Sequence, residues 1–201
     1  ILIAKSDKYN LWKIKKLRYN VCNKHKKGKF MKSNLILIGF MGSGKSTVGK
    51  ILAEKLEMKF LDTDLEIEKE QGRSVQDIFS EKGEEYFRKL ENEMSKKLST
   101  ENNTIISTGG GIILNKENIE YLKKDGVVFF LDVAKKTLYK RLISSKGRPL
   151  LEGDELWNKI NNVLGERLER YRSSADFIVK VGNEIPYETM EDIKKLYIEK
   201  A

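Results

Sequence analysis

The 201-residue sequence contains one cysteine and one histidine, Cys22 and His25. A single cysteine excludes an intramolecular disulfide, and so few Cys and His residues exclude an ordinary zinc site. Both residues precede position 31, so thiol catalysis, imidazole bases and Cys/His metal sites are excluded from the rest of the chain. With only 2 prolines, 39% hydrophobic and 34% charged residues, the composition indicates a globular protein rather than a disordered or fibrous one.

Long apolar runs are also missing. The longest covers residues 35–41, is interrupted by Gly39, and is far shorter than the roughly 18 residues that span a bilayer. The N-terminal residues have no continuous apolar stretch of the kind found in a secretory signal. We therefore expect a cytoplasmic protein with no membrane contact, and a monomer, because no feature of the sequence marks an oligomer interface.

The net charge of +9 is confined to the N-terminal segment. Residues 1–30 carry ten Lys and Arg against one acid, Asp7, whereas residues 31–201 carry 29 basic and 29 acidic residues. We predict a basic extension over 1–30, disordered or non-native, and one domain over 31–201 with no nucleic-acid partner. Three interpretations of the extension stay open: an artefact or dispensable extension, a targeting segment, or a functional basic arm. Met31 would be a natural initiator.

From residue 34 onward, short apolar strands alternate with amphipathic helices. This alternation is typical of βαβ units, in which helices cover both faces of a parallel sheet. We expect strands at 35–39, 60–61, 104–108, 127–133 and 177–181. We expect helices at 45–56, 65–70, 75–81, 84–98, 116–124, 135–143, 156–172 and 187–199. The sequence thus predicts a single α/β domain.

A glycine-rich loop follows the first strand. Residues 39–46 read GFMGSGKS and match the G-x-x-x-x-G-K-[ST] pattern between a strand and a helix. The glycines let backbone N–H groups surround phosphate oxygens, and the start of the helix adds a positive dipole end. Lys45 would reach the β- and γ-phosphates, and the Ser46 hydroxyl would bind Mg²⁺. The loop predicts a nucleoside triphosphate site; the NKxD-type motif of switch GTPases is missing.

Two further motifs contain charged residues that could act together with this loop. Asp62 and Asp64 flank Thr63 just after a short strand, so one carboxylate could face a metal and the other a second substrate; the alternative is a simple helix cap. Arg88 and Glu91 are three apart on a helix and share a face; the alternative is a surface ion pair of little energetic weight.

Two loops complete the pattern. Residues 107–111, STGGG, end an apolar strand, where glycines allow close approach to a ligand, unless they form only a sharp turn. Residues 145–156 contain Arg148 in a Gly-containing loop between two helices. Such a loop is typical of a lid that excludes water and brings a cation to the transferring phosphoryl group; a passive linker is the alternative.

Taken together, residues 32–199 resemble the shikimate kinase family through GFMGSGKS, FLDTD, FRKLE, TGGG, GRPLL and ERYR. The resemblance implies a three-layer P-loop kinase fold, with a five-stranded parallel sheet flanked by helices and a mobile lid. It implies transfer of the ATP γ-phosphoryl group to the 3-hydroxyl of shikimate, with Mg²⁺ as cofactor, in aromatic amino acid biosynthesis. The open alternatives are a same-fold kinase for gluconate or a nucleoside monophosphate, and a nucleic-acid-binding protein on a retired kinase scaffold.

The resemblance also implies residue roles. The expected catalytic residues are Lys45, Asp64 and Arg148, with Asp64 as hydroxyl-orienting group or base. ATP is held through Gly42, Ser43, Gly44, Lys45, Ser46, Thr47, Arg141 and Arg148, and Mg²⁺ through Ser46 and Asp62. Shikimate is held by Asp64, Arg88, Gly110, Gly111 and Arg172, with Glu91 orienting the group. Arg141 would lie against adenine, and the loop near Pro186 would close that side.

Overall fold

The computed structural model describes residues 19–21, 32–144, 154–182 and 186–200. The strands are β1 Tyr19–Val21, β2 Asn34–Ile38, β3 Lys59–Asp62, β4 Thr104–Ser107, β5 Gly126–Val133 and β6 Phe177–Val181. The helices are α2 Lys45–Leu56, α3 Thr63–Gln71, α4 Val75–Leu98, α5 Lys116–Lys123, α6 Lys135–Ser144, α7 Asp154–Ser174 and α8 Pro186–Lys200, with a 3₁₀ turn η1 at Ile112–Leu114.

One sheet joins all the strands, in the order β1-β6-β5-β2-β4-β3. The five strands from β6 to β3 are parallel, which confirms the predicted P-loop kinase sheet. β2 lies at its centre, between β4 and β5, and is fully buried. β1 adds an antiparallel strand at the β6 edge, with Tyr19 opposite Val179. Sequence patterning predicts no strand within residues 1–30, so β1 extends the predicted sheet.

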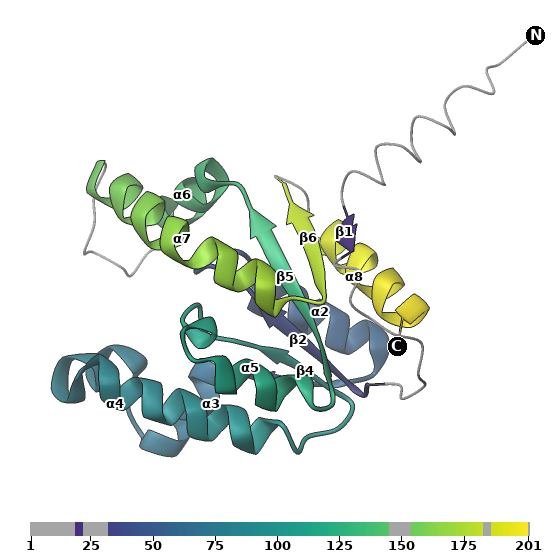
Figure 1. Ribbon diagram of the computed structural model, residues 1–201, viewed down its shortest axis with the longest axis horizontal. Coiled ribbons are helices and arrows are strands. Elements are labelled where there is room, and N and C mark those ends of the chain that lie inside the picture. The colour runs from purple at the N-terminus through teal and green to yellow at the C-terminus, as the bar shows by residue number, and fades with distance from the viewer. Residues whose placement is uncertain (1–18, 22–31, 145–153, 183–185, 201) are drawn as a thin grey trace, which may run out of the picture.

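Helices cover the sheet in layers (Figure 1). α2 and α8 pack together, while α5 and α7 lie on the opposite side, joined through η1. α3 and α4 pack against each other beyond the β3 edge. Because the strands are parallel, their carboxyl ends meet at one edge, where the loops after β2, β3 and β4 converge. The predicted phosphate loop, acidic motif and glycine run are therefore brought together by topology.

Local sequence explains the helix boundaries. Ser74 caps α4 by accepting a hydrogen bond from the Asp77 N–H, and Asp62 caps α3 by accepting one from Asp64. Inside α4, Gly83 has φ 80° and ψ 172°, which divides it into two helical segments. The separate patterns predicted over 75–81 and 84–98 reflect this break. It leaves the second segment, which carries Arg88 and Glu91, free to follow its own axis.

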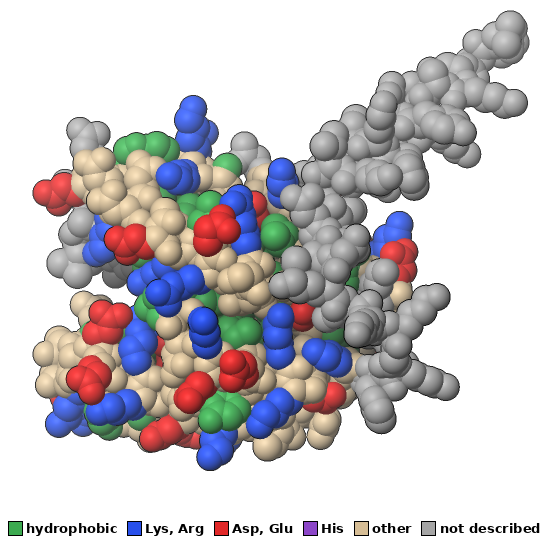
Figure 2. Space-filling view, in the orientation of Figure 1, with side chains coloured by type: hydrophobic (Ala, Val, Ile, Leu, Met, Phe, Trp, Pro, Cys, Tyr) green, Lys and Arg blue, Asp and Glu red, His purple; other side chains and the backbone are tan. Residues whose placement is uncertain are grey.

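The surface of the domain mixes charges of both signs. On the face shown in Figure 2, basic and acidic side chains are interspersed over the α4, α5 and α7 surface. This distribution agrees with the charge balance of residues 31–201. Within the described residues, no helix combines the length and the apolar character needed to cross a membrane. Because the charges of the domain balance overall, an anionic ligand would be bound by individual cations at particular positions.

Candidate active site

The loop between β2 and α2 has the conformation of a phosphate cradle. Gly42 and Gly44 have φ values of 76° and 93°, in the left-handed region that glycine tolerates best. Gly44 is also the N-cap of α2, so the first N–H groups of that helix open onto the loop. Ser43 is buried, and its N–H donates to the Phe40 carbonyl over 3.1 Å. The loop is thus ordered by its own backbone contacts.

Lys45 is folded back into this loop. Its Nζ donates to the carbonyls of Gly39 and Phe40 over 2.9 and 3.0 Å and lies 3.4 Å from Ser43 Oγ. Only 8% of the residue is exposed. Burial lowers the pKa of the ammonium from its usual 10.5 to about 8, although the carboxylates of Asp64 and Asp62 oppose the shift. Lys45 is a desolvated cation at the centre of the predicted triphosphate site.

Three oxygen-bearing side chains meet beside the start of α2. The Ser46 hydroxyl lies 2.7 Å from Asp62 Oδ2 and 3.2 Å from Ser107 Oγ. Within the described parts of the chain, no three His, Cys, Asp or Glu side chains form a metal-holding group. Mg²⁺, however, uses few protein ligands and takes the rest of its shell from phosphates and water. One carboxylate beside a P-loop hydroxyl therefore fits a divalent cation bound with a nucleotide.

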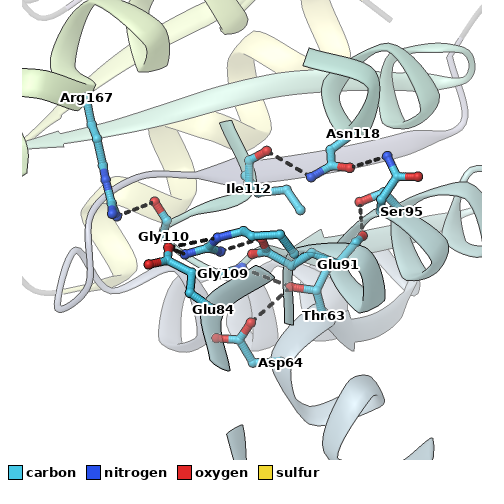
Figure 3. A network of polar contacts seen from close by, with 12 residues as sticks. Thr63, Asp64, Glu84, Glu91, Ser95, Gly109, Gly110, Ile112, Asn118 and Arg167 are labelled. Atoms are coloured by element: carbon cyan, nitrogen blue, oxygen red, sulfur yellow. Dashed lines mark hydrogen bonds and ion pairs between the residues drawn. The ribbon is translucent and has the colours of Figure 1, made fainter. Parts of the chain in front are cut away.

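Asp64 lies between the phosphate loop and the glycine run. Thr63 is fully buried and joins Asp64 to the glycine run: its Oγ1 accepts from the Gly109 N–H over 2.9 Å and lies 3.5 Å from Asp64 Oδ1 (Figure 3). A Cβ on Gly109 would collide with the Asp64 carboxylate, so any larger residue there would displace that carboxylate. Burial raises the pKa of Asp64, as does the negative charge of Asp62, while Lys45 opposes the shift.

Arg88 extends from α4 toward the same glycine run. Its guanidinium donates to Glu84 over 2.8 Å and to Glu91 over 2.5 Å. A Cβ on Gly111 would overlap that guanidinium, so Arg88 packs directly against the glycine backbone. The guanidinium also lies 5.8 Å from the ring centre of Phe79 and 5.4 Å from that of Phe87. Arg88 is held by two carboxylates and two aromatic rings, and is no loose surface pair.

Glu91 is buried behind Arg88, with 1% exposed. Among the described residues, its Oε1 is the one buried side-chain polar atom without a hydrogen-bond partner. Burial raises the pKa of Glu91, against the opposing effect of Arg88. An acceptor left open beside the Arg88 cation is consistent with the orienting role that the family resemblance implies.

The second arginine predicted for this group lies elsewhere. The Arg172 side chain is 45% exposed on α7, and its guanidinium donates to Glu169 over 2.7 Å. Arg167 instead approaches the glycine run, with Nη1 3.4 Å from the Gly110 carbonyl oxygen (Figure 3). Tyr171 contacts the same oxygen over 2.5 Å. Arg167 and Tyr171 are four residues apart and share a helix face, whereas Arg172 is rotated by about 100° from Tyr171.

A cavity of about 520 Å³ opens beside the phosphate loop. Arg141 forms part of its wall, with Nη1 3.3 Å from the carbonyl oxygens of Gly42 and Ser43 and Nη2 3.3 Å from that of Gly182. The rest of the wall comes from α2, α6, β6 and α8, and includes Thr47, Val48, Thr137, Lys140, Val181, Pro186 and Thr189. Arg141, Thr47 and Pro186 therefore lie together at the predicted adenine side. Arg148 and most of the predicted lid lie outside the described residues.

Thr63, Arg167 and Tyr171 were not among the predicted site residues. A helix-face argument could have found the last two, because residues four apart project on one side. In the sequence, Thr63 stands out only as the middle residue of an Asp-Thr-Asp turn. Its burial under the glycine run depends on β3 and β4 being neighbours, with Asp62 opposite Ser107. That pairing depends on how all the strands of the sheet assemble, so the local sequence around Thr63 does not predict it.

Comparisons with known proteins identify the family. Residues 41–197 match the family model described as shikimate kinase. A shikimate kinase of Persephonella marina is 42% identical over 160 residues, covering 80% of this chain and 96% of that protein. The structure of a shikimate kinase from Acinetobacter baumannii in complex with shikimate has a TM-score of 0.78 and 34% identity, covering 83% of this chain and 93% of that one. A gluconokinase structure from Sinorhizobium meliloti, at TM-score 0.51, 15% identity and coverages of 86% and 100%, shares the fold alone. With its phosphate loop, its Asp-Thr-Asp turn and the arginine against its glycine run, the chain belongs to the shikimate kinase family.

Proposed function

We propose that the chain transfers the γ-phosphoryl group of ATP to the 3-hydroxyl of shikimate. One observation carries the proposal: the phosphate loop is joined through Asp62, Thr63 and Asp64 to the glycine run, against which Arg88 is packed. A triphosphate site and a site for a small carboxylate thus share one edge of the sheet. Such an arrangement suits phosphoryl transfer, in which catalysis depends mainly on positioning and on neutralisation of charge.

On the nucleotide side, residues 42–47 would hold the phosphates, and Lys45 would contact the group that is transferred. Arg141 would lie against adenine, and Arg148 would approach the phosphates from the lid. Arginine suits both positions, because its guanidinium is planar and stays charged at every relevant pH. The cavity beside Gly42 and Arg141 gives the base a place to bind.

A divalent cation, Mg²⁺, would be held by Ser46 and Asp62. Bound there, it would neutralise charge on the β- and γ-phosphates. The hydroxyl and the carboxylate already lie 2.7 Å apart, so the protein supplies two hard oxygen ligands without rearranging its backbone. Asp62 also caps α3, which fixes the direction of its carboxylate.

On the acceptor side, Asp64 would orient the attacking hydroxyl and receive its proton. Its raised pKa brings the carboxylate closer to the range in which a base can both accept and release a proton. Arg88 would bind the shikimate carboxylate, with Gly110 and Gly111 presenting backbone to the ring. We assign the second carboxylate contact to Arg167 rather than to Arg172, because Arg167 lies at Gly110 and Arg172 is paired with Glu169 at the surface.

Substrate identity is tested by a coupled ADP-release assay on the full chain. Shikimate, gluconate and AMP are compared at equal concentrations, with ATP and Mg²⁺ present. We expect turnover with shikimate alone, since a site built to bind a carboxylate and a specific hydroxyl rejects compounds that leave its polar groups unpaired. Turnover with gluconate but not with shikimate would overturn the proposal.

The arginine assignment is tested by a matched pair of variants on the same helix. Arg167→Ala should raise the KM for shikimate by roughly 10- to 100-fold, which is the loss of one charge-assisted contact. Arg172→Ala removes an equal charge five residues away and should leave that KM within about twofold. A larger effect from Arg172→Ala would refute the assignment.

A further inference from the structure

The Tyr171 hydroxyl donates to the Gly110 carbonyl oxygen over 2.5 Å. The residue has no exposed surface, and its ring stacks on Phe130 with centres 5.0 Å apart and an 8° interplanar angle. Burial raises the pKa of the phenol to about 12, so the hydroxyl keeps its proton at any physiological pH. A rigid, permanently protonated donor is thus aimed from the core at the backbone of the glycine run.

The hydrogen bond from Tyr171 to the Gly110 carbonyl also orients the N–H at the other end of the same peptide bond. No described peptide is cis, and in a planar trans peptide the carbonyl of one residue and the N–H of the next point in opposite directions. Fixing the Gly110 carbonyl toward Tyr171 therefore fixes the direction of the Gly111 N–H. Gly111 is the residue whose backbone packs against the Arg88 guanidinium.

The neighbouring backbone is tied in the same way. The Gly109 N–H donates to Thr63 Oγ1 over 2.9 Å, and the Gly111 carbonyl accepts from the Leu114 N–H over 2.9 Å. Between these anchors, glycine residues would otherwise rotate freely, because they lack the Cβ that restricts other backbones. The Gly110–Gly111 peptide is the unit whose orientation depends on α7.

We propose that Tyr171 is a positioning residue for the acceptor substrate: through the Gly110 carbonyl it sets the direction in which the Gly111 N–H is presented beside Arg88. The inference rests on the proposed function, since it assigns the acceptor's carboxylate to that place. The same oxygen also accepts from Arg167 Nη1, but over 3.4 Å, which is a much weaker contact than the 2.5 Å one from Tyr171. Tyr171 makes the shorter contact to this peptide, and its hydroxyl also faces the Arg167 guanidinium.

Tyr171→Phe tests the inference because it removes only the hydroxyl and keeps the ring on Phe130. Tyr197→Phe is the matched control: the Tyr197 hydroxyl also donates to a backbone carbonyl, that of Lys32, over 3.0 Å, on α8 and outside the site. For the wild-type chain and both variants, the KM values for shikimate and ATP, kcat and the melting temperature are measured. We expect Tyr171→Phe to raise the KM for shikimate about 5- to 10-fold and to leave the KM for ATP within twofold. The control should leave both KM values unchanged.

Three outcomes would overturn the inference. In the first, the KM for shikimate is unchanged in Tyr171→Phe. In the second, both KM values rise together, which indicates a general loosening of the domain. In the third, the variant fails to fold, which would mean that the Tyr171 hydroxyl is needed for folding rather than for positioning the substrate. Failure of the proposed function is distinct from all of these, because the wild-type chain itself would then show no shikimate-dependent ADP release.

Discussion

Replacing Lys45 with methionine should abolish phosphoryl transfer and yet stabilise the protein without nucleotide. Methionine has nearly the length and shape of the lysine stem but carries no charge. The residue is 8% exposed, and its ammonium hydrogen-bonds mainly to two carbonyls of its own loop. Burial lowers its pKa from 10.5 to about 8, so the folded state disfavours the charged form that predominates at neutral pH.

The magnitude follows from that pKa. Each unit of difference between the folded and unfolded pKa corresponds to about 1.4 kcal/mol, so holding the charge below pH 8 costs about 3 kcal/mol of folding free energy. Methionine removes this cost but leaves the Gly39 carbonyl without its donor, which offsets about 1–2 kcal/mol. The Phe40 carbonyl keeps the Ser43 N–H. The net gain is about 1–2 kcal/mol, or roughly 2–8 °C in Tm for a chain of this size.

The pH dependence of the stability gain distinguishes the removal of a buried charge from a general effect of hydrophobic substitution. A lysine whose folded pKa is lowered binds fewer protons in the folded state, so wild-type stability recovers as pH rises from about 8 to 10.5. The advantage of Lys45→Met should therefore be full at pH 7, fall as the pH rises above 8, and become a deficit of about 1–2 kcal/mol by about pH 10.5, where only the lost hydrogen bond to Gly39 counts. Thermal unfolding without nucleotide measures it, with Lys50→Met, exposed on the same helix, as the control.

Two results would refute this reasoning. A Tm for Lys45→Met at or below that of the wild type at pH 7 would mean that the loop carbonyls fully compensate the buried charge. A gain that persisted unchanged to pH 10.5 would mean that it comes from packing of the methionine rather than from removal of a charge.

Other substitutions test the scaffold, each by denaturant unfolding. Asp176→Ala should cost about 3 kcal/mol, because the buried carboxylate accepts from Lys123 and from the Val128 N–H, both over 2.9 Å; a loss below 1 kcal/mol would contradict that role. Gly165→Ala should gain about 0.5–1 kcal/mol, since a Cβ there meets open space within α7, and a loss would show that the helix needs the glycine. Gly126→Ala should cost about 2–4 kcal/mol, because its Cβ would collide with the Leu122 carbonyl, and a neutral result would contradict that.

The elements could be predicted from sequence where the signal is local. The bounds of α2 follow from a glycine-rich loop before it and an amphipathic pattern within it, and the break at Gly83 appears as two separate helical patterns. β1 could not be predicted, because three residues are too few for a strand pattern to be recognised, and the strand is defined by its pairing with β6. Pairing between distant segments leaves little trace in a short strand.

The candidate site shows the same division. Two short contiguous motifs contain Lys45, Ser46, Asp62 and Asp64. The residue types and spacing within each motif are enough to predict a phosphate and metal site. Which arginine of α7 reaches the glycine run depends instead on how that helix is rotated against η1 and β5. A rotation of about 100° per residue separates a residue that faces the site from a neighbour that faces solvent, and motif spacing alone does not determine it.

The charged groups of the site share one feature that links stability to function. Burial moves the pKa of Lys45 downward and the pKa values of Asp64 and Glu91 upward, so each group is less stable in its charged form than it would be in water. A fold selected only for stability would have no such groups at the edge of its sheet. An anionic ligand reverses the balance for Lys45, since phosphate oxygens replace the water that the ammonium has lost. The cost of burying the Lys45 charge, which lowers the stability of the protein without ligand, would thus be relieved when an anion binds. The net charge of the chain therefore says little about ligand binding, because a buried cation such as Lys45 would bind an anion even though the charges of residues 31–201 balance.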